Sequence, residues 1–194
     1  MNKKILVIIA HPDDETIWMG GTLFRYKNQW DTTIISLCRA DDKDREPKFK
    51  KACEILNANC FISNLDDEGK KINLKEIKNK IARFIKKDKT YDYIFTHGKN
   101  GEYGHQRHIE IHNAVKEMLK KKELIAKQVF FFSYLKKQNN YPGFCIYNSK
   151  ATKLIKLKNF ELLRKKHLIK DVYGYLKGGF EEKSCKKIEA FDIK

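Results

Sequence analysis

The chain has 194 residues, of which 41% are hydrophobic and 34% are charged, and its formal net charge is +16. This length is enough to bury the core of one domain, and we expect a single domain over residues 1–194. No apolar run approaches the roughly 18 residues of a membrane span. The short apolar run near the start lacks the cleavage site of a signal peptide, so we predict a cytoplasmic protein.

The five cysteines and the many lysines form no recognisable site. The cysteines are odd in number and include no Cys-x-x-Cys pair, which argues against a disulfide framework or a cysteine zinc site. The lysines are spread along the chain and do not gather in one basic motif. We therefore interpret the positive charge as solvated helix faces. The alternative is a surface for nucleic acid or another anionic ligand.

Strand and helix patterns alternate along the chain. Apolar or β-branched segments predict strands at 4–10, 32–38, 60–63, 91–96, 128–134 and 189–193. Helical patterns cover 15–29, 47–57, 73–87, 105–119 and 150–170. Asn73 is predicted to cap the helix at 73–87, with Glu76 in the capping-box position. The alternation predicts an α/β fold with a mostly parallel sheet and helices on both of its faces.

The first predicted strand runs directly into His11-Pro12-Asp13-Asp14-Glu15. An imidazole and three carboxylates after a buried strand place charge at the carboxyl edge of the sheet, where open α/β sheets bind ligands. The five residues then form half of a metal site with a general base beside it. The pattern also fits a proline-bearing turn in which an aspartate caps the next helix. Glu15 is interpreted as a first-turn helix residue that favours the helix dipole.

A second polar segment, from His97 to His108, follows the predicted strand at 91–96 and contains three glycines. If a helix begins near His105, then His105 and His108 lie one turn apart on the same face. Both segments follow predicted parallel strands, so we expect them to meet at one edge of the sheet.

Together the two segments supply the ligands and the base of a hydrolytic metal site. His11, Asp14 and His108 provide the three nitrogen and oxygen ligands that a catalytic Zn²⁺ needs, and Fe²⁺ is not excluded by these donors. Asp13 is the natural general base, because it neighbours the ligand Asp14. His105 could stabilise an oxyanion or protonate the leaving group, if it is cationic in the working state.

The two motifs resemble those of a known family. Ala10–Glu15 with the later Gly104-His105-x-x-His108 is similar to the PIG-L/LmbE-type N-acetylglucosaminyl deacetylases. Looser matches occur at 16–23, around Arg45 and at 189–191. The resemblance implies a Rossmann-like three-layer sandwich and a zinc-dependent hydrolase of N-acyl amino sugars. It also implies a small N-acetylated sugar or glycoconjugate as substrate, and a homo-oligomer.

Carried onto this sequence, the resemblance repeats the roles given above. His11, Asp14 and His108 resemble the metal ligands. Asp13 resembles the general base, and His105 resembles the residue that aids the tetrahedral intermediate.

The chain departs from the family between its two histidines. Gln106 and Arg107 stand where many relatives have an acidic residue, so an acidic partner for an imidazole is missing at that place. Arg107, Arg45 and Tyr103 are predicted substrate contacts, and Arg39 and Glu102 are weaker candidates.

A non-catalytic basic α/β domain that binds nucleotide or nucleic acid is the alternative function. No G-x-G-x-x-G follows the first strand and no P-loop is present, so we expect no specific nucleic-acid partner.

Overall fold

The central sheet of the protein has seven strands in the order β3-β2-β1-β4-β5-β9-β8. The computed structural model describes residues 2–85, 89–137 and 143–194. The strands that form the sheet are β1 (Lys3–Ile9), β2 (Trp30–Ser36), β3 (Ala58–Ile62), β4 (Thr90–Thr96), β5 (Ile125–Phe132), β8 (Lys153–Lys156) and β9 (Ile188–Ile193). The first five are parallel, whereas β9 and β8 join antiparallel at the edge. The predicted α/β class with a mostly parallel sheet is confirmed.

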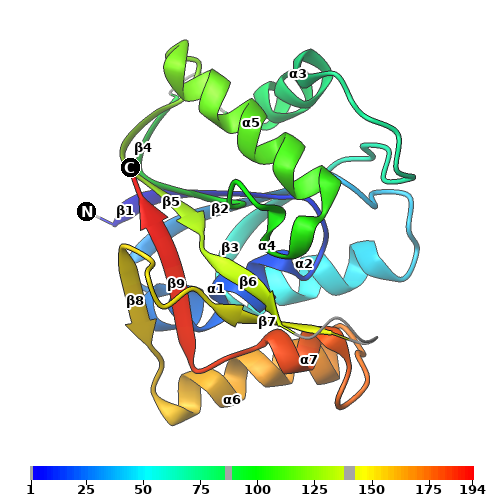
Figure 1. Ribbon diagram of the computed structural model, residues 1–194, viewed down its shortest axis with the longest axis vertical. Coiled ribbons are helices and arrows are strands. Elements are labelled where there is room, and N and C mark those ends of the chain that lie inside the picture. The colour runs from blue at the N-terminus through cyan, green and yellow to red at the C-terminus, as the bar shows by residue number, and fades with distance from the viewer. Residues whose placement is uncertain (1, 86–88, 138–142) are drawn as a thin grey trace.

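Helices cover both faces of this sheet, which gives three layers (Figure 1). On one face lie α3 (Leu74–Phe84) and α5 (Gln106–Lys120), and on the other lie α1 (Asp14–Tyr26), α2 (Arg45–Ile55) and α6 (Asn159–His167). Alternate residues of β1 enter the two cores, since Val7 packs in one cluster and Ile8 in the other. Burial on both sides explains the unbroken apolar run of this strand.

The strand order places a topological switch point between β1 and β4. The chain runs outward from β1 to β2 and β3 on one side, and to β4 and β5 on the other. Ligands in open α/β sheets bind at such a switch point, outside the carboxyl ends of the strands. The loops after β1 and β4 carry the two histidine segments, as the sequence predicted.

The region after β5 differs from the sequence prediction. The expected helix at 150–170 is wrong in its first part, because Lys153–Lys156 pairs with β9 as edge strand β8. Lysines at both ends of this short strand protect the exposed sheet edge, which explains a polar pattern that resembled a helix. Helix α6 follows and continues into a π-helical turn, η1 (Leu168–Val172).

Several short elements were not predicted. They are the hairpin of β6 (Tyr134–Lys137) and β7 (Phe144–Tyr147), the turn α4 (Gly101–Gly104) and the short helix α7 (Phe180–Ser184). The predicted cap of α3 is confirmed, since the Asn73 side chain accepts a hydrogen bond from the Lys75 backbone N–H. Among the described residues, no helix has the length and apolarity needed to cross a bilayer. The single-domain, cytoplasmic and homo-oligomer expectations stay predictions.

Candidate functional site

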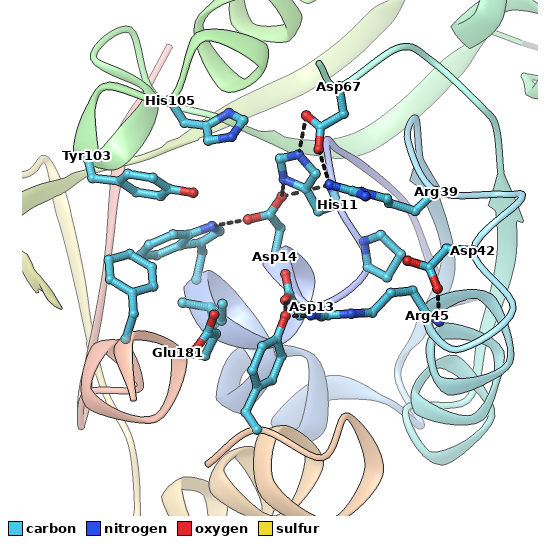
Figure 2. Close-up of a pocket in the computed structure, with 15 residues that line it drawn as sticks. His11, Asp13, Asp14, Arg39, Asp42, Arg45, Asp67, Tyr103, His105 and Glu181 are labelled. Atoms are coloured by element: carbon cyan, nitrogen blue, oxygen red, sulfur yellow. Dashed lines mark hydrogen bonds and ion pairs between the residues drawn. The ribbon is translucent and has the colours of Figure 1, made fainter. Parts of the chain in front are cut away.

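A pocket of about 280 Å³ opens where the loops after β1 and β4 meet (Figure 2). About half of its lining comes from these loops and from α1, and the rest comes from the segments after β2 and β3 and from the C-terminal segment. The lining residues are His11, Pro12, Asp13, Asp14, Ile17, Trp18, Arg39, Asp42, Arg45, Asp67, Tyr103, His105, Tyr175, Phe180 and Glu181. The structure thus brings together Asp13, His11, Asp14 and His105, as predicted.

The turn from β1 into α1 is closed by the side chain of Asp14. Its Oδ2 accepts the His11 backbone N–H at 2.9 Å, and its Oδ1 accepts the Trp18 indole N–H at 2.8 Å. Asp13 stands at the N-terminus of α1 with φ 112°, and its side chain makes no capping hydrogen bond. A non-glycine residue in this region is strained, and such strain gathers at functional sites. The simple helix-cap interpretation therefore does not account for Asp13.

Three donor atoms converge beside Asp13. Nδ1 of His11 lies 3.3 Å from Oδ2 of Asp14 and 3.3 Å from Nε2 of His108, and the last two atoms are 3.4 Å apart. Ligands about 2.0–2.1 Å from a tetrahedral Zn²⁺ would be separated by about 3.3–3.4 Å. Two imidazoles and one carboxylate are also donors that such an ion accepts. The residues present therefore fit a divalent metal of the zinc type.

Three neighbouring groups of potential ligands overlap with this one. The first consists of His11, His105 and His108. His97 lies close to Asp14 and His108, but its Nε2 already accepts the Ala10 backbone N–H at 2.9 Å. Cys38 lies close to His11 and Asp67, and burial raises the pKa of its thiol, which disfavours the thiolate form that binds metals. The donor atoms of His11, Asp14 and His108 lie at the spacing of zinc ligands, so we treat this set as the candidate metal site.

Asp13 is held at one oxygen and open at the other. Its Oδ2 accepts the hydroxyl of Tyr175 and lies 3.3 Å from Nη1 of Arg45. Only 9% of the side chain is exposed, and it lines the pocket. Burial raises the pKa of Asp13, and the neighbouring Asp14 raises it further. A carboxylate of raised pKa in a pocket is suited to accept a proton.

His105 packs edge-to-face against His11 in the pocket lining. The ring centroids are 4.8 Å apart, and Nδ1 of His105 is buried without a hydrogen-bond partner among the described residues. Burial, together with the neighbouring His108 and His11, lowers its pKa to about 4. This shift favours the neutral imidazole, and the role of His105 in the reaction stays a prediction. A neutral imidazole can still donate one N–H to an oxyanion.

The predicted substrate contacts have separate outcomes. Arg45 and Tyr103 line the pocket, although Arg45 is also paired with Asp13. Arg107 does not line it: the side chain is 2% exposed and binds Glu110 and the carbonyl of Lys70. Because these protein groups occupy its guanidinium and it does not line the pocket, Arg107 is not supported as a substrate contact.

Several side chains of the site were missed from the sequence or given another role. Asp67 contacts Nε2 of His11 at 2.9 Å and pairs with Arg39, while Glu102 contacts both His97 and His108. Burial raises the pKa of Glu102, but the two histidines outweigh it and hold the pKa at about 2. Glu15 is fully buried and accepts the Tyr173 hydroxyl, so it is more than a first-turn residue. Asp67 lies in the loop-like segment 66–72, which we expected to form part of the pocket wall, but no motif in the sequence singled out Asp67 or Tyr175.

Comparison with known sequences identifies relatives of this chain. A family model described as "PIG-L: GlcNAc-PI de-N-acetylase" matches residues 6–119. The probable N-acetylglucosaminyl-phosphatidylinositol de-N-acetylase of Dictyostelium discoideum is 27% identical over 135 residues. This match covers 63% of the present chain and 52% of that protein, so the chain spans about half the length of this curated relative.

Solved structures share the fold at low sequence identity. The conserved protein TT1542 of Thermus thermophilus has a TM-score of 0.74 at 17% identity, over 98% of this chain and 94% of that one. N,N'-diacetylchitobiose deacetylase of Pyrococcus horikoshii has a TM-score of 0.65 at 14% identity, covering 99% and 84%. The 4-carboxy-2-hydroxymuconate hydratase GalB of Pseudomonas putida has a TM-score of 0.63 at 13% identity, covering 98% and 95%.

These structural likenesses confirm the fold, but a hydratase shares it, so the fold alone does not name a reaction. The family model carries more weight, because it spans more than half of the chain, including both histidine segments. The chain belongs to the PIG-L family of GlcNAc-PI de-N-acetylases.

Proposed function

We propose that this protein is a zinc-dependent hydrolase that removes an N-acetyl group from an amino-sugar-containing substrate. The observation that carries the proposal is the convergence of His11 Nδ1, Asp14 Oδ2 and His108 Nε2 beside the open carboxylate of Asp13. Family membership supports the reaction class. Zinc is the preferred metal, although Fe²⁺ accepts the same donors.

The reaction adds water to an amide and releases acetate and a free amine. A bound divalent cation supplies Lewis acidity, which makes water more acidic and the acyl carbonyl more electrophilic. Asp13 takes a proton from the attacking water, with Tyr175 and Arg45 holding its other oxygen. His105 donates a hydrogen bond to the oxyanion of the tetrahedral intermediate. Asp13 then returns its proton to the departing nitrogen and is again a carboxylate, while the acetic acid that forms gives its proton to the amine or to water.

The lining of the pocket supports a sugar over a polyanion. It contains five carboxylates, those of Asp13, Asp14, Asp42, Asp67 and Glu181, and two guanidinium groups. Aromatic rings, including Phe180, lie beside them and can cover an apolar sugar face. Carboxylates accept hydrogen bonds from sugar hydroxyls, whereas they repel phosphates. A nucleic-acid ligand in this pocket is therefore disfavoured, despite the net charge of the chain.

Acetate release from N-acetylglucosamine derivatives and chito-oligosaccharides tests the proposal. The protein is stripped of metal, reloaded with Zn²⁺ or Fe²⁺, and compared with Asp13→Asn loaded in the same way. Loss of the general base is expected to lower kcat by about 10²–10⁴-fold, while the bound metal stays at the wild-type level. Undiminished turnover by Asp13→Asn would contradict the assigned role, and no acetate from any substrate would contradict the reaction class.

A further inference from the structure

Both ligand histidines place their second nitrogen against a carboxylate that is not itself a ligand. We propose that Glu102 and Asp67 are positioning residues that fix His108 and His11 as opposite tautomers, with the lone pairs of both aimed at one metal. This inference rests on the proposed function, because it takes the same three ligands as its starting point.

Glu102 is the centre of the first arrangement. It is fully buried, and its Oε1 accepts the backbone N–H of Gly98 at 2.7 Å. Its Oε2 lies 2.5 Å from Nδ1 of His108 and 2.9 Å from Nδ1 of His97. The residue has φ 59°, a conformation that a glutamate adopts only when its surroundings impose it. A strained, buried carboxylate with three donors around it indicates a fixed position.

The hydrogen-bond pattern determines where the protons lie. Nε2 of His97 accepts the Ala10 backbone N–H, so the ring hydrogen of His97 is on Nδ1 and points at Glu102. An ionised carboxylate only accepts hydrogen bonds, so Nδ1 of His108 must also carry a hydrogen. Nε2 of His108 is then left with a lone pair directed at His11 and Asp14. His97 is thus a second donor that holds the carboxylate of Glu102 in place.

Asp67 arranges His11 in the opposite sense. Its Oδ1 lies 2.9 Å from Nε2 of His11, while its Oδ2 accepts Nη2 of Arg39 at 2.7 Å. The hydrogen of His11 is therefore on Nε2, and the lone pair of Nδ1 faces the two other ligands. The Asp67 side chain is 13% exposed and that of Arg39 is 49% exposed. Because Asp67 is partly exposed, water can take over some of its hydrogen bonding to His11 when the carboxylate is removed. Substitution of Asp67 should therefore weaken metal binding less than substitution of the fully buried Glu102.

Metal affinity of variants tests both partners without reference to turnover. Zn²⁺ affinity is measured by competition with a chromophoric chelator for the wild type, Glu102→Gln and Asp67→Asn. Removal of a carboxylate behind a ligand histidine typically weakens metal binding by about 10–100-fold. We expect Glu102→Gln to fall in that range and Asp67→Asn to lose less. Affinity of Glu102→Gln within about twofold of the wild type would overturn the inference.

Glu189→Gln is the matched control. Glu189 is also fully buried, and its carboxylate accepts hydrogen bonds from the backbone N–H groups of Gly21 and Thr22 and from the ammonium of Lys165. None of these partners is a proposed metal ligand. This variant should lose stability and keep wild-type Zn²⁺ affinity. If it weakens Zn²⁺ binding as much as Glu102→Gln does, the effect is one of general stability and the inference is overturned.

Histidine tautomers in the unaltered protein provide a second measurement that does not depend on any variant folding. Two-bond ¹⁵N–¹H spectra of the zinc-loaded protein should show a hydrogen on Nδ1 of His108 and on Nε2 of His11. The same tautomer at both rings would overturn the inference. A wild-type protein that binds no zinc would overturn the proposed function as well, whereas normal zinc binding with insensitive Glu102 and Asp67 variants overturns only this inference.

Discussion

Two adjacent aspartates have different surroundings, and this difference separates their roles. Asp14 accepts hydrogen bonds at both oxygens and faces three imidazoles, those of His108, His97 and His11, which lower its pKa despite its burial. Asp13 is buried beside another carboxylate, which raises its pKa. These environments support the proposed roles, in which Asp14 is a metal ligand and Asp13 is the general base.

Tyr175 and Tyr173 form a matched pair for testing how Asp13 is held. The Tyr175 hydroxyl donates to Asp13, and the Tyr173 hydroxyl donates to Glu15 at 2.8 Å. Tyr175→Phe is expected to lower kcat by about tenfold, since a hydrogen bond to a charged group contributes about 1.5–3 kcal/mol. Tyr173→Phe should lower the free energy of unfolding and leave kcat within about threefold. Steady-state kinetics and urea unfolding of both variants check this, and equal losses of kcat would contradict the assignment.

At the residue scale, the sequence was sufficient to predict those candidate site residues that belong to a local motif. His11, Asp13 and Asp14 follow a buried strand, and His105 and His108 lie one turn apart, so spacing and strand position were enough. Asp67 lies 56 residues from His11, and Tyr175 lies 162 residues from Asp13, both in irregular segments. Only the folded chain brings such residues together, and composition alone gave no reason to choose them.

At the scale of elements, helix α1 carries the site and is fixed from behind by the C-terminal segment. Glu189 of β9 accepts hydrogen bonds from Gly21 and Thr22, and Lys165 of α6 pairs with the same carboxylate at 2.7 Å. Glu189 and Lys165 lie outside the region matched by the family model, residues 6–119. The sequence pattern predicted β9 correctly, but it predicted a helix where β8 lies. An edge strand that carries lysines lacks the regular alternation of apolar residues by which a half-buried strand is recognised.

The two glycines of α1 should respond differently to alanine. A Cβ at Gly21 would overlap the side chain of Leu157, whereas at Gly20 the nearest atom is Cγ2 of Thr16 at 3.3 Å. Overpacking typically costs about 1–3 kcal/mol, and alanine favours a helix by up to about 1 kcal/mol. Gly21→Ala should therefore unfold at lower urea concentration than the wild type, and Gly20→Ala near or above it. Equal midpoints for the two variants would contradict the packing of α1 against Leu157.

At the scale of the whole molecule, the charge of the surface and that of the pocket differ in sign. The chain carries a net charge of +16, yet carboxylates outnumber guanidinium groups in the pocket lining. Surface lysines attract polyanions without selecting a sequence. Because the carboxylates of the pocket lining repel phosphates, we expect nucleic acid to bind at the surface and not in the pocket.

A salt titration of single-stranded DNA binding distinguishes weak binding to the basic surface from binding in the pocket. Binding is expected to be weak and to fall steeply between about 50 and 200 mM salt, as counterion release requires. Acetate release should continue with DNA present at about 200 mM salt. Tight binding that survives high salt and blocks acetate release would instead favour the nucleic-acid alternative.

The central claim is that His11, Asp14 and His108 hold one divalent metal beside Asp13. Anomalous diffraction at the zinc absorption edge, from crystals grown with Zn²⁺, tests it most directly. The account predicts one strong peak within about 2.0–2.2 Å of His11 Nδ1, Asp14 Oδ2 and His108 Nε2. A strong peak at Cys38 and Asp67, or no peak near these three atoms, would contradict it.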